Sequence, residues 1–186
     1  MTEISDKTVQ TPAAIERFVL QWGNMGGAWG VNRSVSQIHA LLYLSEKPLT
    51  AEDIAERLDI ARSNVSNSIK ELLGWGLIRR APVLGERRDY FEAETDIWEV
   101  AALIAAGRKS REIDPAVVAL RACMAAAEDD PSIHPVARRR LKAMLDFTET
   151  VDRWHTQMTG LPKAKLAALI RLGAKIIKFL PLGKAK

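Results

Sequence analysis

Apolar side chains in the first part of the chain recur every three or four residues, which is the spacing of amphipathic helices. Four of them predict a first helix: Ile15, Phe18, Val19 and Trp22. Thr11 offers a capping hydroxyl and Pro12 a first-turn proline, so the helix is expected to begin there. Residues 23–30, GNMGGAWG, hold four glycines in eight positions, which predicts a hinge or the end of this helix.

The next apolar pattern predicts three shorter helices. Residues 34–37 fit a capping box that opens the first of them, and Pro48 ends it. Thr50 caps the second, whose apolar positions share one face. The third covers residues 61–73 and ends in the sequence Gly74-Trp75-Gly76.

The segment after these helices predicts a hairpin, and the rest of the chain is helical again. Residues 77–83 and 89–94 have the composition of two strands, with a charged turn between them. Four helices follow, and the second is expected to begin at Asp114-Pro115. They cover about residues 96–112, 114–129, 135–158 and, after the break at 160–162, a last stretch toward Phe179.

Three short helices followed by a two-stranded hairpin predict a winged helix-turn-helix within a mainly α-helical chain. We expect residues 1–32 to form an N-terminal helix and hinge used in dimerisation. Residues 33–95 would be the winged helix DNA-binding domain, with the hairpin as its wing. Residues 96–186 would be a helical dimerisation and effector region.

The third short helix concentrates small polar residues on the side away from its apolar stripe. At about 100° per residue, Val65, Ile69 and Leu72 share one face, and Asn67 lies opposite them. Short side chains let a helix backbone approach DNA closely, and Asn and Ser can bond base edges while Lys and Arg neutralise phosphates. The predicted DNA contacts, two of them on the wing, are Arg62, Ser63, Asn64, Ser66, Asn67, Lys70, Arg87 and Arg88. An ordinary solvated helix face, or a winged helix that binds protein, would show a similar pattern.

Charge placement favours the DNA interpretation. Residues 33–95 are nearly balanced, with 9 basic and 10 acidic side chains, but residues 62–88 hold six basic and two acidic ones. A basic strip of this kind is the footprint of a nucleic-acid surface.

Composition gives no support to an enzyme, a metal site or a cofactor. The single cysteine, Cys123, excludes an internal disulfide, and His39, His134 and His155 lack the spacing of metal ligands. Neither a catalytic constellation nor a glycine-rich phosphate loop is visible. The N-terminus does not resemble a secretory signal and no apolar run has membrane-spanning length, so a cytoplasmic protein is expected.

Several segments resemble the GbsR-like branch of the MarR-type transcriptional regulators. They are WGLIRR, RRDYFEAETDIW and REIDP, within a match over residues 22–115. The resemblance implies a homodimeric repressor that binds a palindromic operator in double-stranded DNA. It also implies sensing of a small effector, since the branch includes regulators of glycine-betaine synthesis and uptake.

The resemblance also assigns roles to single residues. Residues 63–66 match the start of the family's recognition helix, and Arg87 and Arg88 match its wing. Ala61 stands where the family usually has a capping serine, so the first turn is expected to lack a side-chain cap.

Three further expectations concern the outer helices. Their apolar surface suggests a homodimer interface, although a self-contained helical domain would also fit. Trp22, Trp29 and Trp98 could form an aromatic cage for a quaternary ammonium effector, or could simply be core residues. The tail, residues 161–186, holds seven basic and no acidic residues; we favour a packing helix with a solvated basic face over one lying on a membrane.

Overall fold

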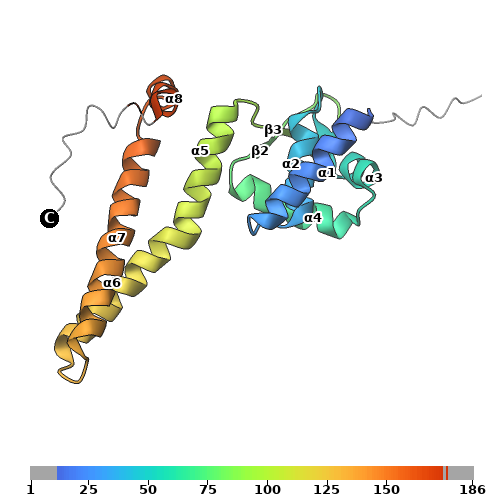
Figure 1. Cartoon of the computed structure of the whole chain (residues 1–186). Coiled ribbons are helices and arrows are strands. Elements are labelled where there is room, and N and C mark those ends of the chain that lie inside the picture. Colours follow the sequence, from blue (N-terminus) through green and yellow to red (C-terminus); the bar gives the residue numbers. More distant parts are fainter. Residues whose placement is uncertain (1–11, 174, 176–186) are drawn as a thin grey trace, which may run out of the picture. The chain divides into compact units, whose positions relative to one another are not determined.

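The computed structural model describes residues 12–173 and residue 175 (Figure 1). The chain divides into two compact units, Met1–Ile104 and Ala105–Lys186. The first contains α1 (Ala13–Ala28), α2 (Arg33–Tyr43), β1 (Leu49–Thr50), α3 (Ala51–Leu58), α4 (Arg62–Gly74), β2 (Ile78–Arg80), β3 (Tyr90–Ala93) and most of α5 (Ile97–Arg108). The second contains the π-helical turn η1 (Lys109–Ile113), α6 (Asp114–Asp129), α7 (Pro135–Thr159) and α8 (Lys163–Leu172).

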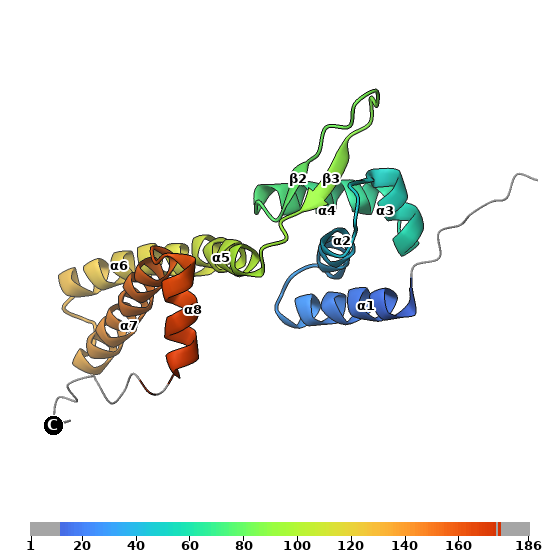
Figure 2. The ribbon, with the colours of Figure 1, turned by 90° about the horizontal axis from the view of Figure 1, so that it is seen from above.

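The first unit is a winged helix, which confirms the predicted fold class. Its core lies between the helices and the small sheet, and Ile38, Ile54 and Val65 are completely buried there. In Figure 2, α2 lies between α1 and the layer formed by α3 and α4, and the β2–β3 hairpin extends beyond the helices.

The sheet has three antiparallel strands in the order β1-β3-β2. The predicted hairpin is present, with Ile78 opposite Ala93 and Arg80 opposite Phe91. The sequence did not predict β1, in which Leu49 pairs with Phe91 and Thr50 with Tyr90. This strand attaches the segment between α2 and α3 to the base of the wing.

Helix α1 continues into the glycine-rich segment and ends within it, which confirms the predicted helix end in residues 23–30 and leaves no hinge before that end. The helix ends only at Trp29, next to Gly30 with its positive φ of 76°. A Cβ on Gly26 would lie 2.6 Å from Ser36 Cβ and even closer to the hydroxyl, so only glycine lets α1 approach α2 here. The expected cap at Thr11 lies outside the described residues.

The helix caps agree with the sequence at two places and differ at one. Thr50 forms a full capping box with Asp53, and Ala61 gives α4 no side-chain cap, as predicted. The box expected at 34–37 is absent, because Asn32 caps α2 with its Oδ1 accepting from Ser34 N at 2.8 Å.

The second unit is built on α6 and α7 packed side by side (Figure 1). The expected helix start at Asp114-Pro115 is confirmed, since α6 begins at Asp114. The chain does not break before it, because η1 joins α5 to α6 and the Asp114 N–H donates to the Lys109 carbonyl. Pro115 has no N–H and its ring crowds the preceding turn, which a wider π turn accommodates. Helix α7 matches its predicted span, whereas the expected extension of the last helix toward Phe179 lies outside the described residues.

Candidate nucleic-acid interface

Helix α4 separates its apolar and polar residues as the sequence predicted. Val65, Ile69 and Leu72 are 0%, 5% and 1% exposed, and they fix the helix to the core. The small polar residues and the lysine on the other side are exposed to solvent: Ser63, Ser66, Asn67 and Lys70. The structure thus brings four of the predicted contacts together on one open face.

A groove of about 400 Å³ runs between this face and the sheet. It is lined by Ala51, Glu52, Ser66, Ile69, Lys70, Leu73, Arg80, Arg88, Asp89 and Phe91. Its charged side chains are three cations and two carboxylates. The three cations can neutralise DNA phosphates, whereas the two carboxylates repel an anion that comes close to them.

Arg80 is a groove residue that the sequence analysis did not select. It stands opposite Phe91 in the β2–β3 ladder and lies 3.6 Å from the Asp89 carboxylate. The alternation of side chains along a strand could have indicated this position. Ile78 is buried, and Arg80, two residues later, lies on the same face of the strand. The side chain stays exposed because the strand ends there.

The two wing arginines lie in different surroundings. The Arg88 Nε donates to Glu86 Oε2 at 3.2 Å, and its Nη2 donates to the Tyr90 hydroxyl at 3.2 Å. The hydrogen bond and charge of Glu86 raise the pKa of Arg88. Arg87 is exposed nearer the wing tip.

Two other predicted contacts are engaged within the domain. Arg62 lies 3.6 Å from the Glu52 carboxylate, in an exposed ion pair between α4 and α3. The Asn64 side-chain amide donates to Ser34 Oγ at 2.9 Å and ties the start of α4 to α2. Their contact with DNA remains a prediction.

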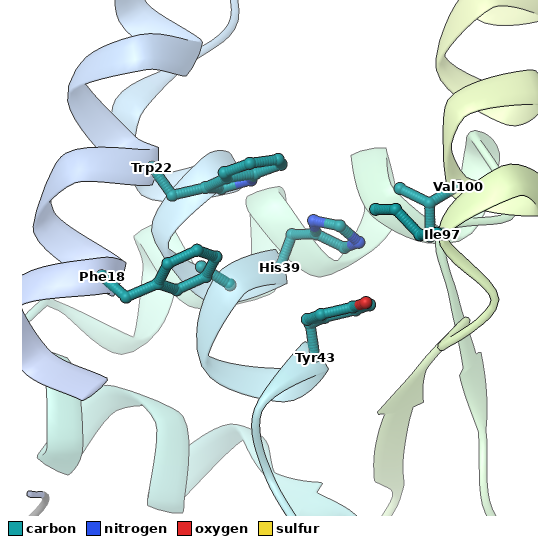
Figure 3. A pocket seen from close by; sticks show the side chains of 7 residues that line it. Phe18, Trp22, His39, Tyr43, Ile97 and Val100 are labelled. Carbon is teal, nitrogen blue, oxygen red and sulfur yellow. The ribbon is translucent and has the colours of Figure 1, made fainter. Parts of the chain in front are cut away.

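A separate apolar pocket of about 200 Å³ lies among α1, α2 and the start of α5 (Figure 3). It is lined by Phe18, Trp22, His39, Ala40, Tyr43, Ile97 and Val100. Of the three tryptophans predicted as a cage, only Trp22 lines it; Trp29 and Trp98 do not. Sequence spacing could not show that α1 and α2 place these other rings beside Trp22.

Among the residues that line this pocket, His39 is the only one with a basic side chain. Burial lowers its pKa to about 4, so the imidazole is uncharged at neutral pH. Its Nε2 atom is buried without a hydrogen-bond partner.

The described part of the chain also bears on metal and membrane binding. It holds no group of three or more His, Cys, Asp or Glu side chains arranged to bind a metal ion. Within the same residues, none of the helices is both long and apolar enough to cross a membrane.

Comparison with known proteins agrees with this geometry. Residues 29–89 match the sequence model of the MarR family. YvaV of Bacillus subtilis, named as an HTH-type transcriptional regulator, is 24% identical over 72 residues, which are 39% of this chain and 41% of YvaV. OpcR of the same organism, named as an HTH-type transcriptional repressor, is 20% identical over 71 residues, 38% of each chain.

The fold is also similar to that of a solved structure described as a transcriptional regulator. The TM-score is 0.62 at 21% identity, over 79% of this chain and 96% of the other. The chain spans only about two fifths of the curated relatives it matches. Together these matches support a winged helix similar to those of MarR-type regulators.

Proposed function

We propose that this chain is a sequence-specific DNA-binding transcriptional regulator that acts as a homodimeric repressor on a palindromic operator. The observation that carries the proposal is the open polar face of α4, with Ser63, Ser66, Asn67 and Lys70 exposed above a buried apolar stripe. A helix of this kind fits the major groove, where short donors and acceptors meet base edges.

The charges around α4 support DNA over a protein partner. Lys70 on α4 and Arg80 on β2 both line the groove, and Arg87 and Arg88 add positive charge on the wing. Cations placed on a helix and on its wing can contact phosphates on either side of a DNA groove. Protein-binding surfaces are instead depleted of lysine at their centre.

A homodimer would account for the exposed apolar side chains of the second unit. Among the described residues of the second unit, only Val117 and Ala127 are buried apolar side chains. Met144, Phe147 and Trp154 on α7 are 59%, 71% and 58% exposed. Exposed apolar surface of this extent marks an interface, and two copies would read the two halves of a palindrome.

The GbsR-like branch and control by a small ligand belong to the same proposal. The segments WGLIRR and REIDP support the branch. The relative OpcR is named a repressor, which agrees with the repressor role proposed here. The resemblance points to a quaternary ammonium compound as one class of effector.

Selection of bound sites from random DNA duplexes tests the proposal directly. We expect a palindromic consensus with half-sites about one helical turn apart. Equal affinity of the wild-type protein for the selected and the random duplexes would contradict sequence-specific binding.

Two variants separate base contacts from phosphate contacts. Asn67→Ala should cost about 1–3 kcal/mol of discrimination at one base position. Lys70→Ala should weaken binding to all duplexes equally. It should also reduce the slope of log affinity against log salt by the amount expected for about one phosphate contact. Arg17→Ala is the control, because Arg17 is an exposed cation on α1, which Figure 2 shows on the far side of α2 from α4.

A further inference from the structure

Helix α8 has an apolar face that the described part of the chain leaves uncovered. None of its ten residues is buried. Ile170 and Leu172 are 60% and 46% exposed, and Leu166 and Leu169 are only half-buried. Figure 1 shows α8 beyond the C-terminal end of α7, away from the turn that joins α6 to α7. Packing within one chain therefore does not account for this face.

The cations of α8 lie on either side of its apolar face. At about 100° per residue, Leu166, Leu169 and Ile170 share an arc of about 100°, which Lys165 and Arg171 flank. Both cations are exposed, and within the described part of the chain neither forms an ion pair. Long basic side chains in this position can keep their charges in a polar layer while the apolar face between them is buried.

The charge of this segment has a single sign. Residues 161–186 hold seven basic side chains and no acidic one. After α8 the sequence continues in the same composition, since residues 174–186 contain four of these lysines together with Ile176, Ile177 and Phe179. On α7, by contrast, Glu149 and Asp152 pair with cations, so the charges there are mixed. A segment that is apolar and only positive complements a partner that is apolar and negative.

This complementarity distinguishes among three kinds of partner. A second copy of α8 would bring two positively charged segments together, which is unfavourable. DNA would bind the cations but would leave Ile170 and Leu172 exposed, because phosphates offer no apolar surface. An anionic lipid surface accommodates both features, since its headgroups meet the cations and its acyl chains meet the apolar face.

We propose that α8 lies on the surface of an anionic membrane, with Ile170 among the acyl chains and Lys165 and Arg171 at the level of the headgroups. The exposure of Ile170 and the unmixed positive charge thus favour the membrane contact over the packing helix preferred from the sequence alone. This contact is additional to the proposed DNA binding and does not rest on it.

Flotation of the full chain with lipid vesicles, in the absence of DNA, tests the proposal. The vesicles contain an equimolar mixture of phosphatidylglycerol and phosphatidylcholine, and vesicles of phosphatidylcholine alone are the comparison. We expect the affinity for the mixed vesicles to be about tenfold higher and to fall as the salt concentration rises. No binding to the mixed vesicles, or equal binding to both kinds, would overturn the proposal.

A matched pair of variants tests the apolar face. Ile170→Asp should weaken binding to the mixed vesicles about tenfold, because a carboxylate disfavours entry into the acyl region. Val118→Asp introduces the same charge at a position 67% exposed on α6 and should leave binding unchanged. Circular dichroism checks that both variants remain helical, as their exposure leads us to expect.

A second pair tests the cations and separates the other partners. Arg171→Glu should weaken vesicle binding, whereas Arg140→Glu, at an exposed position near the start of α7, should not. If Arg171→Glu weakens binding and Ile170→Asp does not, the segment binds polyanions by charge alone and the proposal is refuted. If Ile170→Asp lowers the mass measured by light scattering and leaves vesicle binding unchanged, the face belongs to a subunit interface and the proposal fails.

Discussion

Acidification should destabilise the first unit through one residue, His39. The ordinary pKa of its imidazole is 6.5, and burial lowers the pKa to about 4 in the folded protein. Above about pH 6.5 the ring is neutral in both states and contributes no pH dependence. As the pH falls from 6.5 toward 4, the unfolded chain binds a proton that the folded chain does not, so stability falls.

The size of the effect follows from the difference between the two pKa values. Each unit is worth about 1.4 kcal/mol, so the total loss by pH 4 is about 3 kcal/mol. The variant His39→Leu has no group to protonate and removes the buried Nε2 atom that lacks a partner. Its stability relative to the wild type should therefore rise by about 3 kcal/mol between neutral pH and pH 4.

Urea unfolding followed by tryptophan fluorescence at half-unit steps of pH measures this difference. Acidic groups elsewhere change stability too, but they are shared by both proteins and cancel in the comparison. NMR titration of the His39 ring in the folded protein gives an independent value. Parallel pH profiles for the two proteins, or a folded-state pKa near 6.5, would refute the reasoning.

Three further predictions concern packing, capping and the wing. Gly26→Ala should destabilise the protein by about 1–3 kcal/mol in thermal unfolding because of overpacking against Ser36, and Ser36→Gly should restore most of the loss. Thr50→Ala should cost about 1 kcal/mol in urea unfolding by removing the α3 capping box, while Thr50→Ser should cost less. Arg88→Ala should make the wing more sensitive to limited proteolysis, because it removes the contacts with Glu86 and Tyr90; Arg87→Ala should not, although both should weaken DNA binding. Equal protease sensitivity of the two wing variants would contradict the bracing role of Arg88.

The local features of the winged helix could be predicted from the sequence. The faces of α4 follow from helical geometry, and Thr50 carries its own capping partner three residues later. Each of these depends on residues close together in the chain. They therefore leave a readable pattern.

Features that depend on distant residues could not be predicted in the same way. The glycines of α1 resemble a hinge until Ser36 is placed against Gly26. A two-residue strand such as β1 has no period to detect. The pocket likewise needs His39 and Tyr43 from α2 beside Trp22 of α1, and no spacing within either helix reveals that.

Thr50 belongs to two elements at once, and this has a consequence for how the domain opens. The residue pairs with Tyr90 in the sheet and also caps α3. The base of the wing therefore cannot separate from β1 without disturbing the first turn of α3. We expect the amide hydrogens of both segments to exchange with solvent in one shared opening event, with the wing loop exchanging earlier and independently.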